Sequence, residues 1–444
     1  MTTYWLERAW LGDGPVRDGV LVDVEDGVFT RVAAGSPAEG ERLPGLTIPG
    51  LANCHSHAFH RALRGRTQRE RGTFWTWREQ MYAVAERLTP DTYFELARAT
   101  YREMVSVGVT GVGEFHYLHH GPDGTPYDDP NAMSHALVEA AREAGLRIAL
   151  LDTCYLTAGI GKPAEGVQRR FSDGTADAWA TRATAGRAAP AGRTDRDHSD
   201  VVWGAAIHSV RAVPRDQLST VAGWADERDA PLHVHLSEQV AENAACADAY
   251  GATPTEVLGA AGALGERTSV VHATHLTDRD VALLGGSRSR ACFCPTTERD
   301  LGDGIGPSRV LRDAGAVLTL GSDSHAVVDL FEEMRAVELH ERLATQARGH
   351  WSADELLVAA THDGHASLGF DAGRIAVGAR ADLVTLDPSS VRTAGTGADA
   401  ATVVFAATGA DVVRVLRDGV DVTADPADVG AELDRVIRRL REDR

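Results

Sequence analysis

Metal-capable side chains recur at the ends of four apolar stretches of this 444-residue chain. The four stretches end in His55-Ser56-His57, His233-Val234-His235-Leu236-Ser237-Glu238, His272-Ala273-Thr274-His275 and Gly321-Ser322-Asp323-Ser324-His325. Residues two apart in a strand point to the same side, so His55 and His57 can bind one ion together. A single H-x-H would more often be a surface or core pair. Four apolar stretches that all end in histidine or carboxylate side chains argue against this structural interpretation, because such side chains are seldom buried without a partner.

Imidazole nitrogens combined with a carboxylate are typical ligands of zinc or a similar divalent ion. Such an ion lowers the pKa of its bound water to about 7 and supplies hydroxide at neutral pH. Glu238 follows His235 by three residues and can lie beside that water to carry protons, unless it is an exposed carboxylate at a strand end. The pattern predicts metal-dependent hydrolysis.

Cys292 and Cys294 offer a second metal-like motif, a C-x-C. They lie in the apolar run Ala291-Cys292-Phe293-Cys294, which favours a buried strand over a metal pair. The odd number of cysteines, widely scattered, argues against a disulfide framework.

A repeating framework can position these residues. Eight short apolar runs alternate with stretches of helical patterning, such as 90–107 and 130–144. The runs are 46–57, 109–117, 147–156, 201–210, 231–238, 269–275, 290–296 and 317–325. Eight strands alternating with helices predict an α/β fold, a parallel (β/α)8 barrel of the TIM type, whose chemistry lies at the carboxyl ends of the strands.

The two ends of the chain differ from this pattern. Segments 1–48 and 371–444 are rich in β-forming residues and turn signals, so we expect them to form one small β domain beside a barrel at 49–370. Segment 173–200 is rich in Ala, Arg, Thr and Gly, which predicts a helix running into a flexible surface loop.

The set of motifs His55-x-His57, His235-x-x-Glu238, His272 and Ser322-Asp323 resembles the mononuclear deaminase branch of the amidohydrolase superfamily. The resemblance implies four metal ligands: His55, His57, His235 and Asp323. It implies Glu238 as the proton shuttle, His272 as the residue that orients or polarises the attacking water, and a small β-sandwich domain built from the termini. Asp323 can also accept a proton during catalysis.

The lysine count bears on the number of metals. Binuclear members of this superfamily usually bridge two ions with a carboxylated lysine at the end of strand four. The run 201–210 contains no lysine, and the chain's one lysine is Lys162. We therefore expect one divalent ion per chain, zinc.

Longer strings resemble the formimidoylglutamate deiminase family between about residues 49 and 382. They are Cys54-His55-Ser56-His57-Ala58-Phe59, Phe74-Trp75-Thr76-Trp77-Arg78-Glu79, Glu114-Phe115-His116-Tyr117-Leu118-His119-His120, His208-Ser209-Val210-Arg211-Ala212-Val213 and Leu301-Gly302-Asp303-Gly304-Ile305. Members release ammonia from N-formimidoyl-L-glutamate during histidine degradation and leave N-formyl-L-glutamate. Some members have Gln where this chain has His60, so no role is assigned to His60.

A dicarboxylate substrate of that kind calls for arginine, whose planar fork matches a carboxylate. Arg78, expected on a loop after strand one, and Arg211, after strand four, are the best candidates for binding it. Tyr117 and His208 can add directed hydrogen bonds. The alternatives are surface arginines and, for Tyr117 and His208, buried structural roles.

Other functions stay open. The chain could be another mononuclear amidohydrolase, such as a nucleobase deaminase, or a binding protein that inherited the barrel, since fold alone does not settle function. The net charge of −19 argues against a nucleic-acid partner. No apolar run reaches the about 18 residues of a membrane span, and the N-terminus lacks a signal-peptide pattern, so a cytoplasmic location is expected. The resemblance suggests a homodimer.

Overall fold

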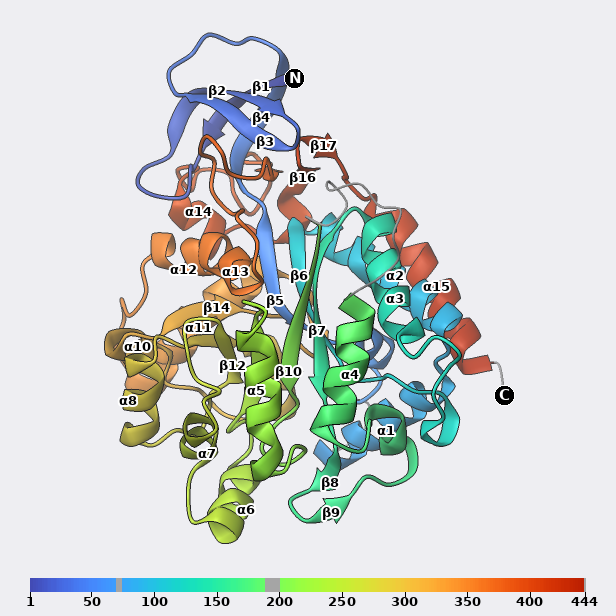
Figure 1. Cartoon of the computed structure of the whole chain (residues 1–444). Helices are drawn as coiled ribbons and strands as arrows, with labels where there is room; N and C mark the ends of the chain where they lie inside the picture. The colour runs from blue at the N-terminus through green and yellow to red at the C-terminus, as the bar shows by residue number, and fades with distance from the viewer. Residues whose placement is uncertain (69–73, 188–199, 443–444) are drawn as a thin grey trace.

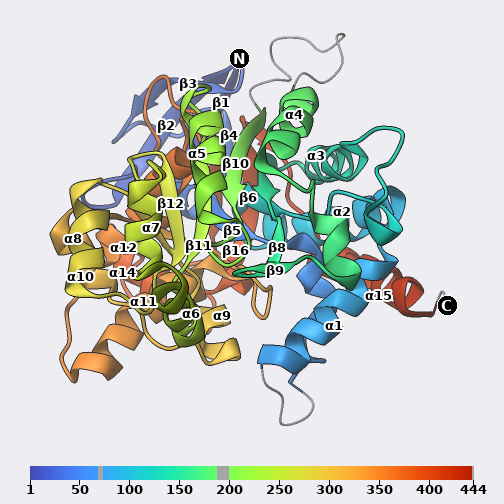
Figure 2. The same cartoon turned by 60° about the horizontal axis from the view of Figure 1, so that its bottom comes forward.

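The computed structural model describes residues 1–68, 74–187 and 200–442. Its centre is a parallel sheet of eight strands that curves into a nearly closed barrel ringed by helices (Figures 1 and 2). The strands follow chain order around the barrel: β5 (Leu51–Ser56), β6 (Val109–His116), β7 (Arg147–Cys154), β10 (Val201–Ile207), β11 (Leu232–Leu236), β12 (Thr268–His272), β13 (Arg290–Phe293) and β14 (Val317–Leu320). Each falls on an apolar run predicted to form a strand, so the predicted fold class is confirmed.

Helices connect the strands and cover the outside of the barrel (Figure 1). They are α1 (Phe74–Arg87), α2 (Pro90–Ser106), α3 (Ala132–Ala144), α4 (Ala176–Arg187), α5 (Leu218–Asp226), α6 (Val240–Tyr250), α7 (Pro254–Ala260), α8 (Asp278–Gly286), α9 (Pro295–Leu301), α10 (Ser308–Ala314), α11 (Leu330–Thr345), α12 (Ala353–Ala360) and α13 (His362–Ser367). Helix α2 starts where predicted because Thr89 caps it and Pro90 suits its first turn. Within the described ranges, no helix is both long and apolar enough to cross a membrane.

The barrel closes between β14 and β5 through the loop that follows β14. The amide of Asp323 donates to the His55 carbonyl at 2.9 Å, and the amide of His57 donates to the Asp323 carbonyl at 3.3 Å. Gly321 permits this approach, since a Cβ there would lie 2.7 Å from the His55 Cβ. Closure therefore brings the predicted ligands of the first and eighth strands together.

The two ends of the chain form one mixed seven-stranded sheet, as expected for a shared β domain. Its order is β17 (Val420–Asp421), β16 (Val412–Arg417), β15 (Leu383–Leu386), β4 (Glu41–Pro49), β1 (Thr2–Ala9), β2 (Arg17–Glu25) and β3 (Val28–Ala33). Strands β4 and β15 pair antiparallel and so join the termini. The predicted run 46–57 divides at Gly50, where a Cβ would meet the Thr110 hydroxyl at 2.2 Å, so β4 belongs to this sheet and β5 to the barrel.

The C-terminal segment also covers the barrel. Helix α15 (Pro426–Glu442) packs along α2, where Glu432 accepts hydrogen bonds from Arg98 (Figure 1).

The domain boundaries at 48/49 and 370/371 stay a prediction. In segment 173–200 the predicted helix is α4, and the predicted loop falls on 188–199, outside the described residues.

Buried and half-buried charges join the small sheet to the amino end of the barrel. We call them the amino-end ion cluster: Arg147, Arg380, Arg417, Asp200, Asp382 and Asp418. Arg147 begins β7, is fully buried, and donates to both carboxylate oxygens of Asp382 and to Asp418. Arg417 pairs with Asp200 at 2.9 Å. Three arginines thus face three aspartates, and the charges balance within the protein.

Candidate active site

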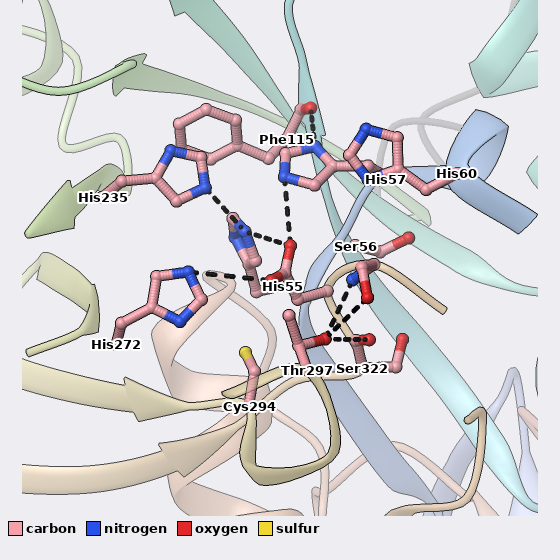
Figure 3. Close-up of polar contacts among 12 residues, drawn as sticks. His55, Ser56, His57, His60, Phe115, His235, His272, Cys294, Thr297 and Ser322 are labelled. Atoms are coloured by element: carbon pink, nitrogen blue, oxygen red, sulfur yellow. Dashed lines mark hydrogen bonds and ion pairs between the residues drawn. The ribbon is translucent and has the colours of Figure 1, made fainter. Parts of the chain in front are cut away.

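The four predicted ligands form one buried cluster at the carboxyl end of the barrel. His55, His57, His235 and Asp323 each offer a ligand atom, and these atoms all lie within 4.8 Å of one another. The Asp323 Oδ1 lies 3.4 Å from His55 Nε2 and 3.3 Å from His57 Nε2. His235 Nε2 lies 3.0 Å from His55 Nε2 (Figure 3).

The orientation of these rings suits a cation. The Nδ1 of His57 donates to the Phe115 carbonyl and that of His235 to the His208 carbonyl, both at 2.9 Å. A neutral ring that donates from Nδ1 keeps its lone pair on Nε2, and such second partners are typical of metal-binding histidines. Burial lowers the pKa of His55 to about 4 and that of His235 well below its usual value, so both rings are neutral at pH 7. Imidazole lone pairs and a carboxylate thus converge on one point, which fits a divalent cation such as zinc.

Backbone strain accumulates at the strand ends that carry these groups. Positive φ angles, between 41° and 70°, occur at Ser237, His272, Ala273, Asp323 and His325. Each such angle at a residue other than glycine costs of order 1–3 kcal/mol and is typical of functional sites. Main-chain hydrogen bonds hold them, including that from the Ala273 amide to the Leu236 carbonyl at 3.0 Å.

His272 lies beside the ligand cluster. Its Nε2 is 3.6 Å from Asp323 Oδ2, and its Nδ1 is 3.5 Å from the Glu298 carboxylate. Burial lowers the pKa of His272, but the carboxylates of Glu238, Glu298 and Asp323 outweigh it and raise the pKa well above its usual value. Sequence reasoning missed Glu298, because nothing in the sequence of α9 indicates that this carboxylate is buried.

The two cysteines of the C-x-C differ in their surroundings. Cys292 lies in β13, as the buried-strand interpretation predicts. Cys294 follows the strand, and its thiol forms a second cluster with His272 and Asp323, in which the ligand atoms again lie within 4.8 Å of one another. All five cysteines are buried and free of disulfides.

A pocket opens beside the ligand cluster. It encloses about 720 Å³ of empty space, part of it open to solvent. Nine predicted site residues line it: His57, Arg78, Tyr117, His208, Arg211, His235, Glu238, His272 and Asp323. His55 lies behind them in the ligand cluster.

Arg211 lies between two glutamates in this pocket. Its Nη2 is 3.9 Å from Glu238 and its Nε is 3.5 Å from Glu242, which is buried at the start of α6. Burial and the neighbouring Glu238 raise the pKa of Glu242, and Arg211 opposes that rise. Glu242 was not predicted as a site residue. Its position four residues after Glu238, in the first turn of the following helix, is the signal that could have found it.

Arg78 reaches the pocket from helix α1 and not from the expected loop. The segment after strand one forms a helix because 74–87 contains no Gly or Pro and is rich in helix formers. The Arg78 Nε donates to the Tyr82 hydroxyl at 2.6 Å. Gln168, on the short helix η3 (Gly166–Phe171), donates to the hydroxyls of Tyr82 and Tyr155 at 2.8 and 3.1 Å. These contacts connect Arg78 with a part of the chain that sequence reasoning did not link to it.

Tyr117 and His208, the residues predicted to hydrogen-bond the substrate, line the same pocket. The Tyr117 hydroxyl lies 3.0 Å from His60 Nε2, so His60 also belongs to the pocket wall. Burial, then the positive charge of Arg211, lowers the pKa of His208 well below its usual value, so this ring is neutral. Leu301 lines the pocket, and burial together with Glu238 raises the pKa of the nearby Asp303 to about 8.

Comparisons with known proteins agree with this geometry. The model of the Amidohydrolase family matches residues 46–422. The chain is 37% identical over 412 residues to the formimidoylglutamate deiminase of Pseudomonas aeruginosa, covering 90% of this chain and 89% of the relative. It is 29% identical over 446 residues to a 5-methylthioadenosine/S-adenosylhomocysteine deaminase of Halobacterium salinarum, covering 97% and 95%. Among solved structures, an amidohydrolase from Brucella melitensis superposes with a TM-score of 0.90 at 30% identity, covering 99% and 100%. An adenosine deaminase from Xanthomonas campestris with bound zinc gives 0.84 at 23% identity, covering 99% and 98%.

Proposed function

Because the chain belongs to the amidohydrolase family, we propose that it hydrolyses N-formimidoyl-L-glutamate to N-formyl-L-glutamate and ammonia, a step of histidine degradation. The observation that carries this proposal is the presence of two arginines, Arg78 and Arg211, in the pocket that also borders the ligand cluster. The likeness to the Pseudomonas aeruginosa deiminase supports the same substrate.

We infer one divalent ion per chain, zinc, held by His55, His57, His235 and Asp323. When bound, such an ion supplies a nucleophilic water at neutral pH. The absence of lysine from β10 supports a single-ion centre, because a bridging lysine is what binuclear relatives place there. Lys162 lies exposed on β9 (Lys162–Pro163).

The charges around the pocket match the two ends of this substrate. An amidine is basic and carries positive charge at neutral pH, whereas the glutamate part carries two carboxylates. Glu238 and Asp323 border the pocket near the ligand cluster, while Arg78 and Arg211 contribute guanidinium groups to its wall. We therefore expect the formimidoyl group to lie at the cluster and the carboxylates to bind the arginines, with Tyr117 and His208 adding hydrogen bonds.

Glu238 would move the protons. It would take one from the attacking water as oxygen bonds to the formimidoyl carbon, which then carries two nitrogens. It would deliver that proton to the terminal nitrogen, so that this C–N bond breaks and ammonia leaves while the formyl group stays on glutamate. Asp323 would accept the remaining proton, and His272 would stabilise charge on the attacking oxygen.

A substrate panel tests this proposal. Zinc-loaded protein is assayed for ammonia release from N-formimidoyl-L-glutamate, cytosine, adenosine and 5-methylthioadenosine. We expect the highest kcat/KM on N-formimidoyl-L-glutamate, and loss of the activity in Glu238→Gln but not in Glu266→Gln, whose carboxylate is exposed. A higher kcat/KM on a nucleoside or nucleobase would show instead that the pocket belongs to a ring deaminase.

A further inference from the structure

The proposed mechanism does not use the thiol of Cys294, which clusters with two residues that it does use. Cys294, His272 and Asp323 offer one sulfur, one nitrogen and one oxygen, all buried and all within 4.8 Å of one another. Figure 3 shows the Cys294 sulfur directed toward the side of the centre on which His272 lies. A thiolate combined with imidazole and carboxylate is a typical donor set for zinc and other thiophilic cations.

Asp323 can serve this cluster and the main one at once, because its two oxygens face different sides. Oδ1 lies 3.4 Å from His55 Nε2 and 3.3 Å from His57 Nε2, whereas Oδ2 lies 3.6 Å from His272 Nε2. This is the geometry of a bridging carboxylate, which gives one oxygen to each of two neighbouring ions, as in known two-metal sites with ions roughly 3.5–4 Å apart.

We propose that His272, Cys294 and Asp323 form a second, weaker metal site that takes a thiophilic divalent cation, and that its occupation inhibits the enzyme. The inhibitory part rests on the proposed function. On binding, the Cys294 S–H bond and one N–H bond of the His272 imidazolium break, a sulfur–metal and a nitrogen–metal bond form, and both protons pass to solvent. The net change is one cation bound and two protons released.

The surroundings explain both the weakness and the inhibition. The site has three protein ligands, one of them shared with the main cluster, so it holds an ion less firmly than a set of four. Glu298 accepts a hydrogen bond from the Cys294 amide at 2.9 Å and faces His272 Nδ1, so it positions both ligands. An ion on His272 occupies the nitrogen that the proposed mechanism directs at the attacking oxygen. His272 and Asp323 line the pocket, which gives a cation its path.

Cadmium titration of protein that already holds one zinc per chain tests the site without any substrate. We expect one further equivalent to bind, with the ultraviolet absorption of a cadmium–thiolate bond. Cys294→Ala should keep its zinc and lose both the absorption and the second equivalent. Cys246→Ala, which removes a buried thiol belonging to neither cluster, should behave like the parent protein. Cys294→Ser serves if the alanine variant does not fold.

Zinc inhibition of ammonia release provides the second readout. Because loss of even an outer partner changes metal affinity ~10–100-fold, we expect Cys294→Ala to raise the inhibitory zinc concentration at least about tenfold. Failure of the zinc-loaded parent protein to bind any further equivalent of cadmium, or a cadmium–thiolate absorption that persists in Cys294→Ala, would overturn the second site. Failure of the proposed substrate leaves the cadmium result unchanged, so the two failures are distinguishable.

Discussion

The two ends of the barrel both bury charged residues, but they balance them differently. In the amino-end ion cluster three arginines face three aspartates, and Arg147 is fully enclosed by its partners. At the carboxyl end, imidazole lone pairs converge with Asp323, and the backbone there is strained. The first arrangement balances its charges without a ligand and joins two parts of the fold. The second presents donors that an ion or substrate can satisfy, which is what distinguishes a binding site from a structural charge cluster.

Removal of the proposed proton shuttle should have the largest effect. Glu238→Gln keeps the size and hydrogen bonding of the side chain but cannot accept the proton. We expect kcat to fall by ~10²–10⁴-fold, the usual contribution of general acid–base catalysis, while metal content and thermal stability stay unchanged. Steady-state kinetics, elemental analysis and thermal denaturation measure these three quantities. A kcat within a few-fold of the parent would assign the proton transfer to another residue.

Arg211→Met should weaken substrate binding strongly. Breaking a buried ion pair costs roughly 3–5 kcal/mol, because a charge is left uncompensated, so KM should rise by at least about a hundredfold with metal content intact. Arg215→Met, on the same segment but exposed, is the matched control. An unchanged kcat/KM in Arg211→Met would show that the substrate carboxylates bind elsewhere.

Arg147→Met should have the opposite effect to Arg211→Met: it should lower the stability of the fold and leave substrate binding unchanged. It leaves Asp382 buried without its cation, so we expect the free energy of unfolding to fall by roughly 3–5 kcal/mol. KM and kcat should stay near their parent values at temperatures where the variant is folded. Denaturant titration and kinetics on the same preparation separate the two effects. If the variant lost kcat as fully as Glu238→Gln while remaining folded, the contrast between the two ends would fail.

Arg78→Met should have a smaller effect on KM than Arg211→Met. A hydrogen bond to a charged group contributes about 1.5–3 kcal/mol, which corresponds to a rise in KM of roughly 10–100-fold. Tyr82→Phe removes the hydroxyl that accepts from Arg78 and should shift KM in the same direction by less. A rise in KM for Tyr82→Phe without one for Arg78→Met would assign the contact to the tyrosine.

Acid should lower the free energy of unfolding through the amino-end ion cluster, by less than Arg147→Met does. Arg147 overcomes the effect of burial and lowers the pKa of Asp382 to about 2 from 3.8. This stabilisation is present above pH 4 and is lost as the pH falls toward 2. It amounts to at most about 2.5 kcal/mol. Burial raises the pKa of Asp418, which offsets part of it. Asp382→Asn should therefore show a shallower loss of stability between pH 4 and 2, and an identical acid profile would contradict the assignment.

The ligand-bearing half of the site could be predicted from the sequence because it consists of strand ends. His55, His57, His235 and Asp323 follow apolar runs whose alternation with helices specifies a barrel, and the barrel brings those ends together. A short apolar run followed by polar residues is a local signal, and the parallel topology supplies the rest.

The remaining features depend on contacts that have no local signal. Arg78 lies on a helix, not on the expected loop, because segment 74–87 is rich in helix-forming residues. Glu242 and Glu298 are buried by packing, and a buried carboxylate has the same sequence appearance as an exposed one. Arg147 and Asp382 are 235 residues apart in the chain, so their pairing follows only from the way the small sheet meets the barrel.

The central claim is that the carboxyl end directs hydrolysis to the terminal C–N bond of a formimidoyl group. Identification of the products by nuclear magnetic resonance, after zinc-loaded protein has consumed N-formimidoyl-L-glutamate, tests it most directly. The account predicts ammonia and N-formyl-L-glutamate in equal amounts. Formamide and free glutamate would mean that the other nitrogen is protonated, and would contradict the deiminase proposal even if the metal centre stood.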